Sequence, residues 1–150
     1  MKKLIALNRK ARFQYFIEDK FEAGIALQGS EIKSIRQGKA NINDAFVSPI
    51  KGELYVLNSH IAKYKQANLL NHDEKRYRKL LLHKNEINKI IGKIQKLGFT
   101  AVVLRMYFND KNKVKLEIGT AKGKKDTDKR QVIKEREWQR EKNRVLKKSD

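Results

Sequence analysis

The chain has 150 residues, with 36 Lys and Arg residues against 17 Asp and Glu residues, which gives a formal net charge of +19. This length allows one domain and an appendage, and the charge indicates a phosphate-rich partner, nucleic acid before an anionic membrane. No apolar run approaches the roughly 20 residues that span a bilayer, and the absence of cysteine excludes disulfides and thiolate chemistry. Residues 1–7 resemble the start of a signal peptide but lack a cleavage site, so we expect a cytoplasmic protein that does not insert into membranes.

Most of the first 121 residues are predicted to form short β-strands. In residues 21–27, apolar side chains alternate with Glu22 and Gly24, which is typical of a half-buried strand. Turns are expected at Lys51-Gly52 and at residues 109–112. They join further predicted strands over residues 46–49, 53–57, 79–82, 99–108 and 113–119.

Two helices interrupt these strands. Ser30 is expected to cap a short helix that ends at Gly38. A clearer helix is predicted over residues 84–97, where Gly98 is a natural terminating residue and apolar side chains recur at Ile87, Ile90, Ile91, Ile94 and Leu97. Between the helices, residues 66–75 form a long polar loop. Roughly five to seven short strands and two helices predict a mainly β protein with short helices, an OB-like antiparallel β-barrel over residues 1–121.

The C-terminal segment, residues 122–150, differs from this barrel in composition. Between residues 122 and 148 there are twelve basic and five acidic residues and few apolar ones, so the segment cannot offset its ordering entropy alone. Wound into a helix, it has two opposite faces, Ile133 excepted: a basic stripe of Arg136, Arg140, Arg144 and Lys148, and an apolar arc of Val132, Trp138, Val145 and Leu146. We predict a basic C-terminal tail, disordered when free and helical when bound to a polyanion.

Signals of catalysis and metal binding are weak. His60, His72 and His83 lie far apart and have no metal-ligand neighbour at i+3 or i+4, so each is expected at the surface or at an edge. Residues 119–125 resemble a phosphate-binding loop only faintly, because the glycines are one residue too close and Lys125 occupies the magnesium-binding position. We expect neither an enzyme nor a cofactor or metal site.

Basic and aromatic residues occur together in two runs. Residues 8–12 contain three basic side chains and precede three aromatic residues, and residues 75–79 surround Tyr77 with four cations. Cations bind phosphates without sequence preference, while aromatic rings and Arg planes stack on unpaired bases. Each run taken singly could be a solvated face, and each ring could belong to the core. The net charge of the whole chain favours an RNA-binding surface.

Glu22 is unusual in this setting, because a carboxylate that faces RNA is electrostatically unexpected. It shares a strand face with Gly24 and Ala26, so that face is expected to be nearly bare and open to another backbone. The carboxylate could accept two hydrogen bonds from an unpaired guanine, or one from a cytosine amino group. The alternative is an exposed glutamate that pairs with a neighbouring lysine.

Several long blocks follow one another along the chain: Asn8–Arg12, Phe21–Gly29, Glu31–Ser34, Arg36–Asn41, Arg78–Leu82, Ala121–Lys125, Asp128–Arg130 and Lys134–Trp138. In these blocks the chain resembles the SsrA-binding protein (small protein B) family of bacterial trans-translation. The resemblance covers essentially all 150 residues. Several long blocks in the right order are far more specific than any short motif.

The resemblance implies an OB-like barrel bound to the tRNA-like domain of transfer-messenger RNA (tmRNA), at its elbow. It also implies that the pair enters stalled ribosomes that lack a codon in the A site. There the body replaces the missing anticodon arm, and the tail folds as a helix in the empty messenger channel beside the decoding centre. This agrees with the two-faced tail, and we expect the protein to be a monomer.

The resemblance also assigns roles to individual residues. For the tmRNA surface it implies Asn8, Arg9, Lys10, Arg12, Glu22, Lys33, Ser34, Arg36, Lys39, Asn41, Arg78 and Lys79. For the ribosome-binding tail it implies Lys122, Lys124, Lys125, Asp128, Lys129, Arg130 and Trp138, to which the basic stripe adds Arg136, Arg140 and Arg144. In one departure, Thr127 stands where the family commonly has a histidine proposed to stack on a decoding-centre base, and threonine cannot stack.

Two other classes of function compete with an RNA-binding adaptor. A structural ribosomal protein with a basic extension fits the same size, charge and tail. A nuclease with an unrecognised carboxylate site would need magnesium-dependent RNA cleavage. The sequence favours the adaptor, whose body holds a structured RNA and whose tail then engages ribosomal RNA.

Overall fold

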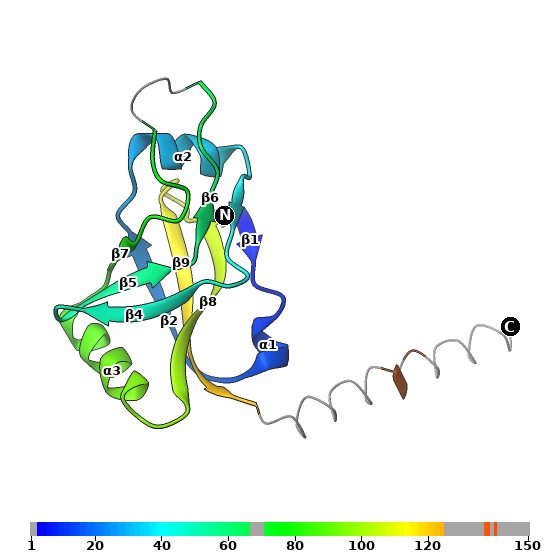
Figure 1. Ribbon diagram of the computed structural model, residues 1–150, viewed down its shortest axis with the longest axis vertical. Coiled ribbons are helices and arrows are strands. Elements are labelled where there is room, and N and C mark those ends of the chain that lie inside the picture. Colours follow the sequence, from blue (N-terminus) through cyan, green and yellow to red (C-terminus); the bar gives the residue numbers. More distant parts are fainter. Residues whose placement is uncertain (1–2, 67–70, 125–136, 139, 141–150) are drawn as a thin grey trace, which may run out of the picture.

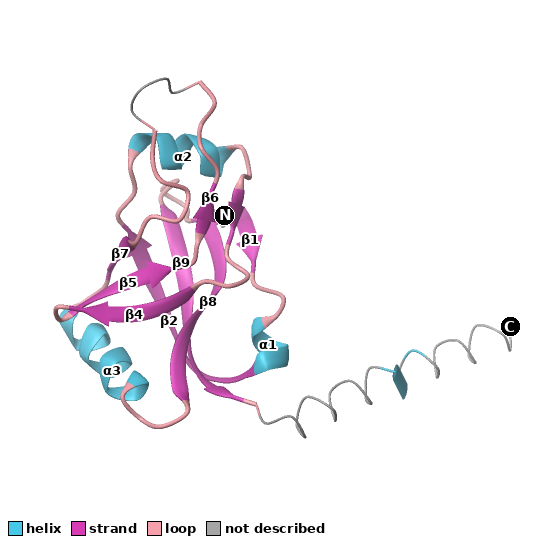
Figure 2. Ribbon diagram, in the orientation of Figure 1, coloured by secondary structure: helices cyan, strands magenta, loops and turns pink. Residues whose placement is uncertain are grey.

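The computed structural model describes residues 3–66 and 71–124, together with residues 137, 138 and 140 (Figure 1). Strands dominate this part of the chain, and the helices lie at its periphery (Figure 2). In chain order the elements are β1 (Lys3–Leu7), α1 (Ala11–Gln14), β2 (Tyr15–Ile25), α2 (Gly29–Arg36), β3 (Ala40–Asn41), β4 (Phe46–Ile50), β5 (Glu53–Leu57), β6 (His60–Ile61), β7 (Arg78–Leu81), α3 (Lys84–Ile94), β8 (Phe99–Phe108) and β9 (Val114–Gly123).

A seven-stranded sheet curls into a ring. Its strand order is β1-β8-β4-β5-β7-β2-β9, and the additional pairing of β9 with β8 closes the ring. On the edge that faces away from β9, β8 pairs with two strands. Its residues Ala101 and Val102 pair with β4, and its C-terminal half pairs with β1. All pairings are antiparallel. The predicted mainly β, OB-like barrel is therefore confirmed.

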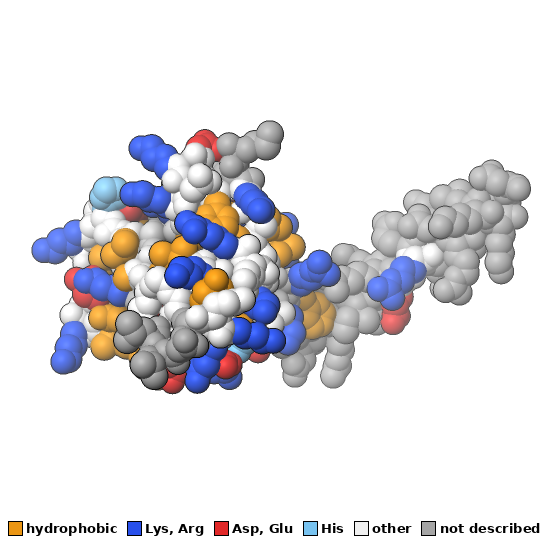
Figure 3. Space-filling view, turned by 90° about the horizontal axis from the view of Figure 1, so that it is seen from above, with side chains coloured by type: hydrophobic (Ala, Val, Ile, Leu, Met, Phe, Trp, Pro, Cys, Tyr) orange, Lys and Arg blue, Asp and Glu red, His pale blue; other side chains and the backbone are white. Residues whose placement is uncertain are grey.

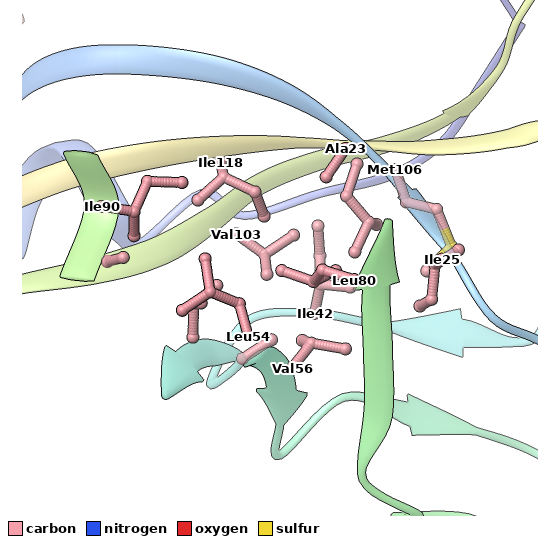
Figure 4. Packing of buried hydrophobic residues seen from close by; sticks show 14 of the residues in the cluster. Ala23, Ile25, Ile42, Leu54, Val56, Leu80, Ile90, Val103, Met106 and Ile118 are labelled. Atoms are coloured by element: carbon pink, nitrogen blue, oxygen red, sulfur yellow. The ribbon is translucent and has the colours of Figure 1, made fainter. Parts of the chain in front are cut away.

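The hydrophobic core fills the inside of this ring (Figure 4). Alternate residues of the strands point inward, so that Ala23 and Ile25 of β2 meet Leu54, Leu80 and Ile118 from other strands. Each of these side chains is at most 8% exposed. The opposite face of β8 and β9 carries a smaller cluster that holds α1, formed by Ala11, Val102, Leu104 and Ala121.

Helix α3 covers one end of the barrel with its apolar face. Ile87 and Ile90 are buried there, as the helical periodicity predicted. The helix ends at Ile94, earlier than expected, and Leu97 is fully exposed instead of continuing the apolar stripe. Gly98 has a φ of 81°, so its left-handed backbone serves the turn into β8.

Helix α2 begins two residues before the predicted position. Its N-cap is Gln28, whose N–H donates to Glu31 Oε1 at 2.7 Å in a capping box. Ser30 lies inside the first turn, and its Oγ is 2.8 Å from His72 Nδ1. The prediction of a Ser30 cap was wrong because the Gln28 and Glu31 pair already satisfies the helix start.

Some elements had no clear signal in the sequence. Strand β1 and the short helix α1 were not predicted, and β2 begins at Tyr15 rather than at residue 21. The register of β2 shifts between Ile17 and Lys20, which hides the alternation in its first half. At the other end, β9 continues to Gly123, so the boundary expected after residue 121 falls inside a strand. Most of the predicted tail lies outside the described residues.

Strand β9 approaches its neighbours most closely at Gly119. A Cβ atom there would lie 2.9 Å from Leu104 Cδ1 and 3.0 Å from Ile17 Cγ2. We predict that Gly119→Ala lowers the free energy of unfolding by about 1–3 kcal/mol, because packed side chains must move to admit the methyl group. Urea unfolding followed by circular dichroism measures the change.

Gly92→Ala is the matched control, because Gly92 lies in the exposed part of α3 and its Cβ position is open. There alanine should raise the free energy of unfolding by roughly 0.5–1 kcal/mol, through helix propensity. Equal effects of the two substitutions would contradict close packing at Gly119.

Candidate nucleic-acid interface

A hollow of about 820 Å³ opens beside Glu22, between strands β2, β7 and β9 and the start of α3. We call it the Glu22 hollow, and the side chains that matter below are Glu22, Lys79, Leu81, Lys84 and Lys115. The three lysines can neutralise phosphates, and Leu81, which is 54% exposed, offers an apolar surface to a base. Glu53 and Glu86 also line the hollow, so carboxylates and lysines are mixed there, and such a surface offers groups for both the bases and the phosphates of a nucleic acid.

Glu22 points away from the core because neighbouring residues of a strand face opposite sides of the sheet. Its neighbour Ala23 is fully buried, whereas Glu22 is exposed. The Tyr107 hydroxyl donates a hydrogen bond to Glu22 Oε2. Directly opposite Glu22 across β2 and β9 lies Glu117, whose Oε2 is 3.7 Å from Arg105 Nε. The carboxylate of Glu22 therefore lies on the outer face of the sheet at the hollow.

The strand face around Glu22 is not bare, and that expectation was wrong. Gly24 pairs with Leu81 of β7 on one side and with Lys115 of β9 on the other. A Cβ atom on Gly24 would lie 3.2 Å from Leu81 Cβ and 3.6 Å from Lys115 Nζ. Side chains from strands that are distant in the sequence therefore cover the glycine.

A second, smaller hollow of about 330 Å³ lies between β1 and the segment around β3. We call it the Arg9 groove, because Arg9 and Asn41 line it. It brings together two blocks that the sequence predicted to bind RNA. Lys10 is exposed nearby, with its Nζ 3.9 Å from Asp44 Oδ1, and Arg12 is exposed on α1.

More of the predicted RNA-binding side chains gather around helix α2. Lys33, Arg36 and Lys39 are exposed, and Lys33 Nζ lies 5.5 Å from the centroid of the Tyr64 ring. Viewed from the α2 end, Lys and Arg side chains are spread over the surface and Asp and Glu are sparse (Figure 3). This end of the molecule is therefore suited to a phosphate backbone, although these residues do not line the Glu22 hollow.

A buried ion-pair network connects α2 to β7. Glu31 is fully buried and accepts hydrogen bonds from Arg76 Nη2, at 2.7 Å, and from Arg78 Nε. Arg78 Nη1 also donates to the carbonyl and the hydroxyl of Ser59, at 3.1 and 2.9 Å. Burial alone raises the pKa of Glu31, but the hydrogen bonds from Arg76, from the Gln28 N–H and from Arg78 together hold that pKa below its ordinary value of 4.5.

Three side chains predicted to touch RNA are buried instead. Arg78 and Ser34 are 0% exposed and Asn8 is 8% exposed. Asn8 Nδ2 donates to the Val103 carbonyl at 2.9 Å, and its Oδ1 accepts from the Lys10 N–H at 3.2 Å. For these three residues we correct the expected direct contact: the side chains of Asn8 and Arg78 support the surface from inside through their hydrogen bonds, and the Ser34 hydroxyl is buried without a hydrogen-bond partner in the described part of the chain. The sequence could not reveal this burial, because the type of a polar residue does not indicate whether its side chain is solvated or buried.

The first residues of the predicted tail are fixed to the barrel. Lys124 Nζ donates to the Arg12 carbonyl at 2.8 Å and lies 4.9 Å from the centroid of the Phe16 ring. Lys122 Nζ lies 6.0 Å from the Phe99 ring. Of the other predicted tail residues, Trp138 and Arg140 are described and exposed. Outside the described residues lie Lys125, Asp128, Lys129, Arg130, Arg136 and Arg144.

The histidines are held by hydrogen bonds. His72 was expected at the surface, but it is 3% exposed, with Nε2 2.8 Å from the Ile61 carbonyl oxygen. His60 Nε2 is 2.7 Å from Glu74 Oε2. Across residues 3–66 and 71–124, no three His, Asp or Glu side chains gather as ligands for a metal ion. The helices of that same part are too short or too polar to span a bilayer.

Sequence reasoning missed three residues near Glu22, namely Lys84, Lys115 and Tyr107. The alternation in residues 113–119 put Lys115 on the outer face of its strand, but the pairing of β2 with β9 was needed to place it beside Gly24. Tyr107 lies in an apolar run of β8, where nothing in the sequence distinguishes it from a core residue.

Comparisons with known proteins agree with one another. The model of the family described as SmpB protein matches residues 5–148. The chain is 58% identical over 144 residues to the SsrA-binding protein of Orientia tsutsugamushi (strain Ikeda), covering 96% of this chain and 94% of that protein. It is 59% identical over 144 residues to the SsrA-binding protein of Wolbachia pipientis subsp. Culex pipiens (strain wPip), covering 96% and 97%.

A solved structure is also similar, described as "tmRNA-SmpB: a journey to the center of the bacterial ribosome". It has a TM-score of 0.68 and 42% sequence identity to this chain. The match covers 85% of this chain and 92% of that one. The similarity therefore extends to the fold as well as the sequence.

The buried Glu31 carboxylate generates a pH-dependent prediction. Its pKa is lower in the folded chain than in the unfolded one, so its stabilisation is complete above the unfolded value and is lost as the pH falls through the folded value. Glu31→Gln should therefore lower the free energy of unfolding by roughly 3–5 kcal/mol at neutral pH, since it leaves buried guanidinium groups uncompensated. Below pH 4.5 the variant and the unaltered chain should become more similar in their free energy of unfolding.

Urea unfolding at a series of pH values between about 2.5 and 7 measures the free energy of unfolding and therefore both effects. Glu53→Gln is the control, because Glu53 is half-exposed and lies 3.9 Å from Lys79 Nζ. An exposed pair contributes little, so this variant should follow the unaltered chain at every pH. A parallel loss in both variants would contradict a structural role of the Glu31 network.

Proposed function

The chain belongs to the SmpB protein family, and we propose that it is an RNA-binding adaptor that binds the tRNA-like domain of tmRNA. It delivers tmRNA to the A site of stalled ribosomes for trans-translation, which rescues the ribosome and tags the unfinished peptide. The observation that carries this proposal is the similarity to SsrA-binding proteins over nearly the whole length, so that it includes both the barrel and the tail.

The body is proposed to bind RNA at two places. In the Glu22 hollow, the Glu22 carboxylate accepts hydrogen bonds from an unpaired base. The lysines of the hollow, Lys79, Lys84 and Lys115, bind the adjoining phosphates. The Arg9 groove and the exposed cations of α2 bind the RNA backbone. This division is supported by the geometry, because a carboxylate specifies a base and lysines provide affinity without sequence preference.

The body and the tail are proposed to act separately. Residues 1–121 hold tmRNA, and residues 122–150 engage the decoding centre and the messenger channel. The positions of Lys122 and Lys124 at the barrel surface support a tail that starts from a fixed point. The tail contributes +6 of the net charge and the body +13, so each part can bind a polyanion by itself.

This function requires no catalytic group, and we propose that the chain acts by binding alone, as a monomer and in the cytoplasm where ribosomes work. The competing function, a structural ribosomal protein, is not favoured, because the similar proteins are named as binders of SsrA. Sedimentation distinguishes the two: an adaptor is substoichiometric on ribosomes and follows one small RNA, whereas a structural protein remains on all subunits after a salt wash.

Glu22→Gln tests the proposed base contact. The variant should bind the tRNA-like domain roughly tenfold more weakly, because it loses a charge-assisted hydrogen bond, and should bind an unrelated RNA duplex almost normally. Fluorescence anisotropy at a fixed salt concentration measures both affinities. Glu117→Gln is the matched control, since it removes the same charge from the residue directly opposite. Equal losses for both RNAs would show that Glu22 does not read a base.

Deletion of residues 130–150 tests the division of labour. The truncated chain should bind the tRNA-like domain almost as tightly as the intact chain, because the proposed RNA contacts lie in the body, but tagging of stalled peptides should be abolished. A chain with the same tail residues in scrambled order keeps the charge but loses the two-faced arrangement, and it should also fail to tag. Tagging by the truncated chain would contradict the proposal.

A further inference from the structure

We propose that Tyr107 is a positioning residue for RNA recognition: its hydroxyl holds the Glu22 carboxylate in the orientation that accepts hydrogen bonds from the base. The inference rests on the proposed role of Glu22 in RNA binding. It adds a residue that lies in β8, two strands away from Glu22, and that does not line the Glu22 hollow itself.

The three-strand ribbon β2-β9-β8 sets this geometry. Lys115 of β9 pairs with Gly24 of β2 on one side and with Tyr107 of β8 on the other. Paired residues face the same side of a sheet, so all three lie on the outer face, as Glu22 does. From there the Tyr107 hydroxyl donates to Glu22 Oε2, although β9 lies between the two strands.

The surroundings of Tyr107 fix its ring. Tyr107 is only 5% exposed, while Glu22 at the other end of the hydrogen bond is exposed. Burial, and then the hydrogen bond to Glu22, raise the pKa of Tyr107 above its ordinary value of 10, so the hydroxyl stays protonated and acts as a donor at neutral pH. An anchored donor thus bonds to the carboxylate at the end of a flexible side chain.

This arrangement prepares Glu22 for binding. An exposed glutamate loses rotamer freedom when it binds a base, which weakens binding. The bond from Tyr107 fixes the carboxylate before the RNA arrives, so less freedom is lost in the complex. A carboxylate has more than one acceptor site on each oxygen, so the bond from Tyr107 does not by itself prevent Glu22 from accepting hydrogen bonds from a guanine edge.

A double-mutant cycle in the full-length chain tests the proposal. Tyr107→Phe keeps the buried ring and removes only the hydroxyl, and it is combined with Glu22→Gln. Affinity is measured for a transcribed tRNA-like domain and for an unrelated RNA duplex of equal length. Tyr15→Phe, which removes a hydroxyl from a half-buried tyrosine elsewhere in the barrel, is the matched control. Thermal unfolding of every variant is recorded alongside.

The expected result is that Tyr107→Phe weakens binding of the tRNA-like domain roughly three- to tenfold and leaves duplex binding unchanged. In the Glu22→Gln background the same substitution should have almost no effect. Equal losses in the two backgrounds, or no loss in the unaltered background, would overturn the proposal while Glu22 kept its role. If Glu22→Gln alone has no effect, the proposed function of Glu22 fails, and the inference fails with it.

A second measurement does not depend on how well Tyr107→Phe folds. The ¹³Cζ chemical shift of a tyrosine reports hydrogen bonding of its hydroxyl, so Glu22→Gln should move the Tyr107 signal and leave the Tyr15 signal in place. An unmoved Tyr107 signal would overturn the proposal.

Discussion

The pairing of β9 with both β2 and β8 is the interaction on which the rest of the structure depends. It closes the barrel, because β8 and β9 pair in addition to the linear order of the sheet. It places Glu22, Lys115 and Tyr107, which come from three strands, on one outer face. It also carries the chain to Lys124, where the tail starts against α1. Gly119 permits this close packing, since a larger residue would collide with Leu104.

Charge has two separate roles in this protein. Most of the basic side chains among the described residues are exposed, and the resulting positive surface attracts phosphates over a distance set by the salt concentration. Glu31 and Arg78 are instead buried together, and their ion pair holds α2 against β7. Because α2 presents Lys33 and Arg36, the buried pair determines where part of the basic surface lies. Stability and the proposed RNA-binding surface are thus connected through one helix.

The sequence predicted the barrel well, because alternation identifies a strand such as residues 113–119 without knowledge of its partner. It did not predict which polar residues are buried. Arg78 and His72 depend on partners that only folding brings near, so no local pattern distinguishes them from surface residues. Glu22 was identified from its unusual charge and from the family resemblance. Tyr107 was not identified, because its proposed role arises from the pairing of β9 with both β2 and β8.

The most direct test is to map where RNA meets the folded body. Backbone amide shifts of the isotopically labelled full-length chain, followed during titration with the tRNA-like domain, report this residue by residue. The account predicts that the largest changes fall on β2, β7 and β9 around the Glu22 hollow, while the outer face of α3 near Lys89 changes little. Changes that are largest on that outer face of α3, or that are confined to residues after Lys124, would contradict RNA recognition by this face of the barrel.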